Sequence, residues 1–282
     1  RNLASNVVSC CRSCKRDRKD RWLSLLPLAH TLEMTVGMLY PMFCGASIYY
    51  LQKPPVPALL LKAIKQVRPT TILSVPLIIE KIYKGSVLPT IKGSRTLRWM
   101  DKHANRLMCK IIGMKLKSTF GGHLTFFGVG GAKMDPEVES FLLKAGFPYA
   151  VGYGLTETSP LVAYSLKRWR CVGSIGYPVY NVKMKLADVN PETGEGEIVV
   201  KGPNVMLGYY KDPKRTKSVF TEDGWFRTND LAVIDGKGRF FIKGRKNNMI
   251  LGSSGENIYP EEIESVINNQ DGVTESIVVE RN

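Results

Sequence analysis

The stretch Gly-Tyr-Gly-Leu-Thr-Glu-Thr, residues 152–158, decides how the rest of the sequence is interpreted. Its two glycines permit the tight turns and close backbone approaches that a side chain would block. Between them Tyr153 can lie flat against a base, while Thr156 and Glu157 face a phosphate and its metal. Glu157 fits beside a phosphate only with a cation such as Mg²⁺ between the two, and Mg²⁺ prefers oxygen ligands. The alternative is an ordinary glycine-bounded turn that caps a helix at Thr156.

Composition narrows the class of protein. With 282 residues, 44% of them hydrophobic and 23% charged, the chain is expected to be globular and to form two or three lobes. The net charge of +15 favours anionic partners, namely nucleotides, coenzymes, nucleic acid or an acidic membrane surface. Because aromatic residues do not alternate with Lys and Arg in any run, the sequence argues against nucleic acid.

The cysteines and the first residues indicate the compartment. Cys11 and Cys14 form a CxxC pair without a second Cys/His pair nearby, so free thiols in a reducing cytoplasm are predicted rather than a zinc site. The first residues are not expected to be a signal peptide, and the sequence opens on Arg1 within a predicted helix, so a piece of a longer protein is expected. The apolar stretch Leu25–Leu51 contains charged and proline residues, so no membrane span is predicted there. The basic cluster in residues 12–21 is interpreted as a solvated turn, and the alternatives are a coenzyme contact or peripheral contact at the inner face of the membrane.

Residues 1–170 alternate between helix and strand patterns, which predicts a mostly parallel sheet with covering helices. A helix over 1–21 leads to a strand, Trp22–Leu28, and His30 follows where strand gives way to helix. Functional groups gather at such carboxyl ends of strands. The remaining expectations are helices at 31–39, 57–67, 76–84, within 85–120 and at 136–145, and strands at 46–51, 70–75, 124–129 and 148–151.

The pattern changes after residue 170. Short strands separated by turn residues predict a small antiparallel β-barrel over 171–244, with strands at 172–186, 196–201 and 231–242. The segment 245–282 is expected to be the hinge and the start of a small α+β domain, with a helix Pro260–Asn268 and a strand Glu275–Val279. The predicted fold class is therefore α/β, with these two smaller parts after the large one.

Several glycine and charged positions suggest one site. Neighbouring parallel strands would place the glycines of 130–132 and 152–154 side by side, as a floor for a flat base. Asp230 closes the tight turn 223–230 and either grips two sugar hydroxyls or merely forms a surface hairpin. Arg245 either pairs with Asp230 or joins it on a ribose. The glycine-rich loop 251–260 either approaches an extended substrate or only connects two elements.

Six segments, in this order, resemble the adenylate-forming enzymes, and among them the AMP-forming long-chain acyl-CoA synthetases. The resemblance covers nearly the whole chain. The matching segments are LSLLPLAHTLE (23–33), FGVGGAKMDPEV (127–138), GYGLTETSP (152–160), GEIVVKGPNVMLGYYKDP (196–213), DGWFRTNDLAVIDGKGRFFIKGR (223–245) and GENIYPEEIE (255–264).

The resemblance implies a role for each matching residue. Thr156 would hold the α-phosphate, Glu157 would bind Mg²⁺, and His30 would lie near the carboxylate and the leaving pyrophosphate. Tyr153 would stack on adenine, and Asp230, helped by Arg245, would hold the ribose hydroxyls. The remaining positions expected to bind ATP or coenzyme A are Gly130, Gly131, Ala132, Gly152, Gly154, Ile242, Gly252 and Gly255.

The reaction that the resemblance implies has two steps. A fatty carboxylate attacks the α-phosphate of ATP to give acyl-adenylate and pyrophosphate, and coenzyme A thiol then displaces AMP. An anionic nucleophile must approach an anionic phosphorus, so Mg²⁺ and fixed donors must offset the repulsion. In this family the C-terminal domain rotates between the steps, and the loop 251–260 resembles the piece that lines the pantetheine tunnel.

The sequence also departs from the family pattern. The phosphate loop rich in Ser, Thr and Gly and the C-terminal lysine used in adenylation are not among these residues, so the 282 residues alone are expected not to form acyl-adenylate. Asn229 stands where Gly is usual, and Asn247 and Asn248 where Lys and Asp are usual. Two alternatives stay open: another adenylate-forming ligase, such as a fatty acyl-AMP ligase, and a non-catalytic fragment that binds nucleotide.

Overall fold

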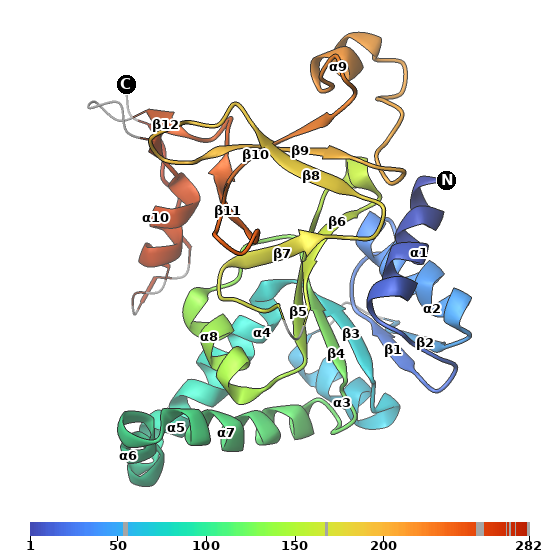
Figure 1. Ribbon diagram of the computed structural model, residues 1–282. Coiled ribbons are helices and arrows are strands. Elements are labelled where there is room, and N and C mark those ends of the chain that lie inside the picture. Colours follow the sequence, from blue (N-terminus) through green and yellow to red (C-terminus); the bar gives the residue numbers. More distant parts are fainter. Residues whose placement is uncertain are drawn as a thin grey trace.

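The computed structural model describes residues 1–52, 56–166, 169–251, 257–268, 270, 272–273 and 275–280. Within these ranges one eleven-stranded sheet crosses the molecule, in the order β2-β1-β3-β4-β5-β6-β7-β11-β10-β9-β8 (Figure 1). The strands are β1 (Arg21–Ser24), β2 (Ser47–Tyr50), β3 (Thr71–Ser74), β4 (Phe126–Val129), β5 (Tyr149–Gly154), β6 (Leu161–Ser165), β7 (Ser174–Pro178), β8 (Lys183–Ala187), β9 (Gly196–Lys201), β10 (Phe226–Ile234) and β11 (Phe240–Arg245). A separate two-stranded sheet pairs β12 (Ile250–Leu251) with β13 (Asn257–Ile258).

The first half of the sheet is parallel, as the alternation of helices and strands predicts. Strands β1 to β5 all run parallel to one another. The first antiparallel pairing is that of β5 with β6. The α-helices of the chain are α1 (Asn2–Ser13), α2 (Tyr40–Cys44), α3 (Pro57–Val67), α4 (Pro76–Ile82), α5 (Leu88–Gly93), α6 (Arg95–His103), α7 (Asn105–Thr119), α8 (Pro136–Ala145), α9 (Pro213–Ser218) and α10 (Pro260–Ile267). Two π-helices, η1 (Glu33–Leu39) and η2 (Tyr83–Val87), and a 3₁₀ turn, η3 (Thr156–Thr158), complete the helical segments described.

Local sequence signals place the elements next to the site. The helix α8 begins because Asp135 caps it, accepting hydrogen bonds from the backbone N–H groups of Glu137 at 2.8 Å and Val138 at 3.3 Å. It ends at Gly146, which adopts the left-handed conformation with φ of 66°. The predicted bounds of α3 and α8 are confirmed.

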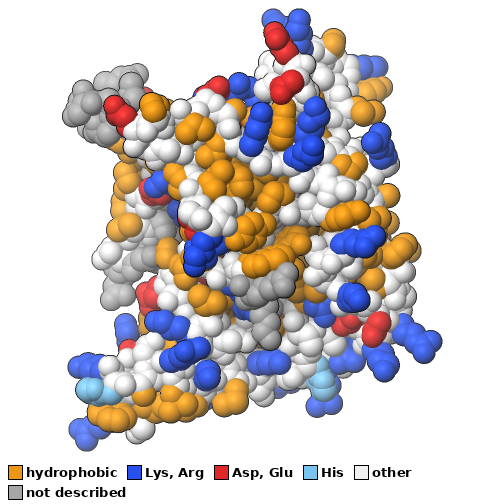
Figure 2. Space-filling view, viewed as in Figure 1, with side chains coloured by type: hydrophobic (Ala, Val, Ile, Leu, Met, Phe, Trp, Pro, Cys, Tyr) orange, Lys and Arg blue, Asp and Glu red, His pale blue; other side chains and the backbone are white. Residues whose placement is uncertain are grey.

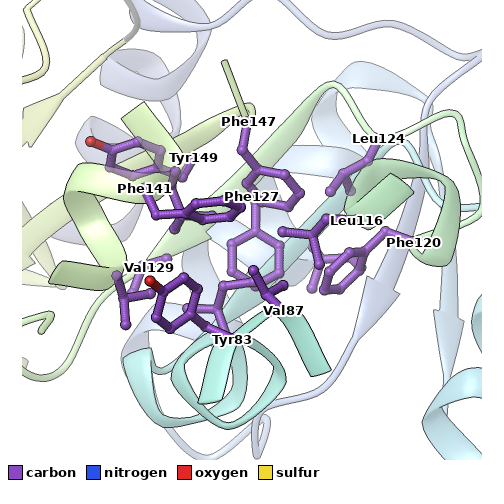
Figure 3. Packing of buried hydrophobic residues seen from close by; sticks show 14 of the residues in the cluster. Tyr83, Val87, Leu116, Phe120, Leu124, Phe127, Val129, Phe141, Phe147 and Tyr149 are labelled. Carbon is purple, nitrogen blue, oxygen red and sulfur yellow. The ribbon is translucent and has the colours of Figure 1, made fainter. Parts of the chain in front are cut away.

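An aromatic core fixes the parallel strands against α7 and α8. The rings of Phe120, Phe127 and Phe147 contact one another with centroids 5.4–5.7 Å apart, and Tyr83 packs on Phe141 (Figure 3). Phe127 comes from β4 and has no exposed surface. Burial of these aromatic side chains stabilises β4, and the glycines of 130–132 follow directly after that strand.

The second half of the sheet is antiparallel, but the described strands do not close into the predicted barrel. β7 pairs with β6 on one side and with β11 on the other, so the antiparallel strands continue the large sheet and end on β8. A second core fills this half, with Val162, Ile198 and Phe226 at its centre. One sheet contains strands from both sides of residue 170, so the sheet itself marks no boundary there. The division into 1–170, 171–244 and 245–282 remains a proposal.

Other expectations need correction at their boundaries. The first helix ends at Ser13 rather than near residue 21, because β1 already begins at Arg21 to pair with β2 and β3. Correspondingly β1 stops at Ser24, short of Leu28. The strand predicted at Glu275–Val279 is wrong, since residues 275–280 form no ladder; the backbone N–H of Val278 donates instead to the Glu264 carboxylate at 2.9 Å. Among the described residues, no helix has both the length and the apolar character needed to cross a bilayer.

Candidate functional site

Two cavities meet along the end of β5. One has a volume of about 320 Å³ and the other about 590 Å³, and both use Gly131, the segment 151–155 and Arg245 as walls. The smaller cavity is further lined by His30, Thr156, Glu157 and the apolar residues Trp22, Leu32, Val36, Leu73 and Phe126. The larger one is lined by Ala132, Lys133, Asp230, Ile242, Lys243, Glu261 and Glu264.

The glycine floor forms because β4 and β5 are parallel neighbours. Val129 lies opposite Val151, so the loop after β4 lies against the segment Gly152–Gly154. Gly131 has a φ of 88°, a conformation that L side chains avoid. The predicted strand end was wrong by three residues: β5 continues to Gly154, because it also pairs with β6. The glycines of 152–154 therefore lie within a strand rather than in a turn.

Gly154 allows a close backbone crossing. An ideal Cβ at this position would lie 1.8 Å from the carbonyl oxygen of Pro160, so only glycine fits without moving the chain. The same crossing is held by Leu155, whose N–H donates to the Pro160 carbonyl at 3.1 Å. The buried Asn6 of α1 adds two hydrogen bonds, from Nδ2 to the Thr158 carbonyl at 2.9 Å and from the Leu161 N–H to Oδ1 at 3.1 Å.

The hydroxyl of Thr156 and the carboxylate of Glu157 lie on the rim of the smaller cavity. Thr156 is exposed and Glu157 is half-buried. The hydroxyl of Tyr209 donates to Oε1 of Glu157 at 3.0 Å, and the Met206 N–H donates to the Glu157 carbonyl at 2.8 Å. The carboxylate is thus oriented from the far side by the segment 206–209.

Asp230 is buried in β10 and faces the larger cavity, in contact with Tyr153. The Tyr153 hydroxyl donates to Oδ2 of Asp230 at 2.6 Å, and Arg245 Nε lies 3.6 Å from Oδ1. Burial raises the pKa of Asp230, while the Tyr153 hydroxyl and the Arg245 charge oppose that rise. Burial and the neighbouring Asp230 charge also raise the pKa of Tyr153 well above its ordinary value.

A β-bulge sets the position of Asp230, which corrects the predicted tight turn. The pairing of β10 with β9 shifts register between Arg227 and Leu231, and Asn229 has a φ of 65° inside the bulge. Asparagine tolerates this left-handed conformation better than other side-chain-bearing residues, so the departure from Gly at this position is compatible with the fold. The arrangement puts Asp230 opposite Arg245 in the β10–β11 ladder.

Glu197 stabilises the β-bulge at Asn229. Its buried carboxylate accepts the Asn229 N–H at 3.1 Å, and it pairs with Arg227 at 2.6 Å and with Lys246 at 3.3 Å. Removing a partner from such a buried charge usually costs several kcal/mol, about 3–5. Glu197 therefore holds the backbone that presents Asp230, although it does not line either of the two cavities.

His30 and the hinge residues complete the candidate set. His30 lines the smaller cavity, with Nδ1 accepting the Leu32 N–H at 3.1 Å. Beyond Arg245, Asn248 donates through Nδ2 to Glu261 of α10 at 2.8 Å, which links the turn after β11 to that helix. Asn247 is exposed in the same turn.

The structure brings the predicted residues of both cavities together around β5. The smaller cavity takes His30, Gly130, Thr156 and Glu157, and the larger takes Ala132, Asp230 and Ile242. The last two predicted positions, Gly252 and Gly255, lie outside the described residues.

Sequence reasoning did not single out three supporting residues, Asn6, Glu197 and Tyr209. Glu197 and Tyr209 lie inside the segment 196–213 quoted above. That segment identified the family resemblance but did not indicate what these two side chains contact. No sequence signal marks Asn6, because its partners are more than 150 residues away.

Comparison with known proteins gives a family match. The family model described as "AMP-binding enzyme" matches residues 1–210. A curated relative, the peroxisomal long chain acyl-CoA synthetase 6 of Arabidopsis thaliana, is 32% identical over 94% of this chain and 41% of its own length. The chain thus spans about two fifths of the length of that relative.

Solved structures of similar proteins support the fold. The ATP-bound MatB from Rhodopseudomonas palustris is 28% identical with a TM-score of 0.78, over 99% of this chain and 50% of that one. The O-succinylbenzoate coenzyme A synthetase (MenE) from Bacillus subtilis, in complex with ATP and a magnesium ion, is 25% identical with a TM-score of 0.75, over 98% and 52%. The predicted α/β class is confirmed by these matches.

Proposed function

The chain belongs to the AMP-binding enzyme family, and we propose that it forms the adenylate-binding part of a long-chain fatty-acid–CoA ligase. The protein as a whole would convert a fatty carboxylate and ATP to an acyl-adenylate and pyrophosphate. Coenzyme A thiol would then displace AMP to give the thioester. The long-chain assignment is supported by the curated relative, which is named for long-chain acyl-CoA synthesis.

The observation that carries the proposal is the pair of cavities that share the wall 151–155. One presents Asp230 and Arg245, a carboxylate and a cation suited to ribose hydroxyls and a phosphate. The other presents Thr156 and Glu157 beside an apolar lining. An acyl-adenylate has the same two halves, a polar nucleoside and an apolar acyl chain, joined at one phosphate. The shared wall is where that phosphate would lie.

On the nucleoside side, Asp230 would accept hydrogen bonds from the ribose hydroxyls. Its carboxylate is buried and already accepts one hydrogen bond from Tyr153, so it is held in place before any ligand arrives. The ring of Tyr153 and the floor formed by Gly131 and Ala132 would flank the adenine. Ile242 would contribute apolar surface from β11.

Mg²⁺ fits at Glu157. One carboxylate oxygen is oriented by Tyr209, the side chain lines the cavity, and Mg²⁺ is commonly bound by one or two carboxylates together with substrate phosphates. When bound, the ion would offset the negative charge on the phosphates. The hydroxyl of the exposed Thr156 would donate to the α-phosphate at the same rim, and His30 would position the carboxylate end of the acyl group.

The acyl chain would occupy the smaller cavity. Its lining includes the side chains of Trp22, Leu32, Val36, Leu73 and Phe126, so it can exclude water from a hydrocarbon chain. Coenzyme A would approach past the hinge near Arg245, and the net charge of +15 favours an anionic coenzyme.

Titration calorimetry of the chain with a hydrolysis-resistant acyl-adenylate, a palmitoyl sulfamoyl adenosine, tests the proposal. We expect saturable binding by the unsubstituted chain. In Asp230→Ala the affinity should fall by at least roughly tenfold, which is about the effect of losing one buried hydrogen-bonding group. Asp235→Ala is the matched control, because Asp235 is a half-buried turn aspartate that lines neither cavity. Absence of binding by the unsubstituted chain would overturn the proposal.

The substrate class is tested on the full-length protein. Thioester formation should be faster with palmitate than with acetate or benzoate. Equal rates with benzoate would favour a ligase for aryl acids, and accumulation of acyl-AMP without thioester would favour a fatty acyl-AMP ligase.

A further inference from the structure

The helices α6 and α7 carry an apolar surface that faces away from the body of the molecule. Trp99 is 61% exposed, and on α7 the residues Leu107, Ile111 and Met114 are 55%, 41% and 67% exposed. Positions 107, 111 and 114 follow the spacing of one helix face, so these side chains form a continuous stripe. In Figure 2, which keeps the view of Figure 1, hydrophobic atoms run along the lower edge of the molecule where α6 and α7 lie.

The stripe is not an unburied part of the core. The opposite face of α7 packs inward through Met108, Cys109, Ile112 and Leu116, all of them buried. The helix therefore has two apolar faces, and only one of them is used by the fold. An amphipathic helix on the surface of a globular protein ordinarily presents polar residues on its outer face.

Cations flank the outer stripe on both sides. Arg106 and Lys110 lie along one edge of it on the helical wheel, and Lys115 lies along the other, all three of them exposed. The segment 92–117 holds eight Lys or Arg residues and one acidic residue, Asp101. The eight are Lys92, Arg95, Arg98, Lys102, Arg106, Lys110, Lys115 and Lys117.

Trp99 is an exposed aromatic residue on the neighbouring helix α6. Its ring lies against that of His103, with centroids 5.1 Å apart, and remains largely exposed. Tryptophan is enriched where an apolar phase meets water, because its ring is apolar while its N–H can stay hydrated. An exposed tryptophan, an apolar stripe and a rim of cations together match an interfacial helix rather than a solvated one.

We propose that α6 and α7 form a docking face for an anionic lipid bilayer. The apolar stripe would enter the interface between headgroups and acyl chains, and the surrounding cations would lie at the level of the lipid phosphates. The charge of this face favours a lipid bilayer as its partner, because an excess of cations complements an anionic membrane surface. The proposal concerns adsorption on the bilayer surface and does not depend on the adenylate site.

Vesicle sedimentation with the 282-residue chain tests the proposal. We expect binding to vesicles that contain phosphatidylglycerol, little binding to pure phosphatidylcholine, and loss of binding as salt rises. Arg106→Glu with Lys110→Glu should weaken binding to the anionic vesicles by at least roughly tenfold, since each cation near such a surface contributes about fivefold. Leu107→Ser with Met114→Ser should weaken it by a similar factor.

Matched controls are available on the opposite side of the molecule. Leu207 and Tyr210 are even more exposed than the stripe, and Lys214 and Lys217 are exposed cations of α9. Leu207→Ser with Tyr210→Ser, and Lys214→Glu with Lys217→Glu, should leave vesicle binding within about twofold of the unsubstituted chain. Because every substituted residue is exposed, circular dichroism should show unchanged folding in all variants.

Three outcomes would overturn the proposal. The first is equal binding to zwitterionic and anionic vesicles, and the second is equal loss in the stripe and control variants. The third is dimerisation in sedimentation velocity runs that Leu107→Ser with Met114→Ser abolishes, without vesicle binding. That result would assign the face to a second copy of the chain instead.

Discussion

The hydroxyl of Tyr153 donates a 2.6 Å hydrogen bond to Oδ2 of Asp230, and both side chains are buried. The pair joins the parallel half of the sheet to the antiparallel half, since Tyr153 lies on β5 and Asp230 on β10. It also joins the two cavities, because Tyr153 lines both of them. The residue proposed to flank adenine therefore holds the residue proposed to bind ribose.

We predict that Tyr153→Phe separates stability from binding. The variant leaves one oxygen of a buried carboxylate without its donor, so the free energy of unfolding should fall by about 1–3 kcal/mol. The ring remains, and one Asp230 oxygen is freed for the ribose, so affinity for the acyl-adenylate analogue should change by less than about threefold. Urea denaturation and calorimetry measure the two effects. A tenfold loss of affinity without loss of stability would show that the hydroxyl itself contacts the ligand.

Glu157→Gln should reduce only the metal-dependent part of nucleotide binding. The amide keeps the size of the side chain but loses the charge that would attract Mg²⁺. We expect the affinity for ATP with Mg²⁺ to fall by about tenfold, while the affinity for AMP without metal stays within about twofold. Tyr209→Phe is the matched control, because it removes the partner of Glu157 and keeps the carboxylate. Equal effects of Glu157→Gln with and without Mg²⁺ would contradict the assignment.

Gly154→Ala should destabilise the fold strongly. The added Cβ would lie 1.8 Å from the Pro160 carbonyl oxygen, and that oxygen belongs to backbone that is already tied to Leu155. Forcing the strands apart is expected to cost about 3 kcal/mol or more. Gly85→Ala, in the π-helix η2, is the control, because its added Cβ would meet nothing within 4 Å. Thermal denaturation of both variants tests the prediction. Similar unfolding midpoints for the two variants would contradict the close backbone crossing at Gly154.

Glu33 should make stability depend on pH. The side chain is 1% exposed, Oε2 has no hydrogen-bond partner among the described residues, and burial raises its pKa above the ordinary value of 4.5 against the effect of Ser24. A raised folded-state pKa means that the protonated form is favoured on folding, so the contribution is full below pH 4.5 and is lost as pH rises through the folded pKa.

Replacement of Glu33 by Gln should remove that dependence. Relative to the unsubstituted chain, Glu33→Gln should gain about 1 kcal/mol of unfolding free energy between about pH 4 and pH 8. Urea denaturation across this range measures it. Glu137→Gln is the control, as a less buried carboxylate. Parallel pH curves for Glu33→Gln and the unsubstituted chain would contradict the prediction.

The sequence by itself determined the fold class and the identities of the candidate residues, because these depend on local patterns. Alternating helix and strand signals, the Asp135 cap and the six ordered motifs can all be read without contacts. It also placed the glycines of 130–132 beside those of 152–154, since parallel neighbours end at the same edge of a sheet.

Only the tertiary structure decided how those residues are held. The end of β5 at Gly154, the bulge at Asn229 and the open continuation of the sheet arise from pairing between strands that are distant in sequence. The hydrogen bond between Tyr153 and Asp230 spans 77 positions, and no periodicity or propensity records a contact of that range. Local patterns report what a segment prefers, whereas the strand partners that it meets decide where it ends and which way its side chains face.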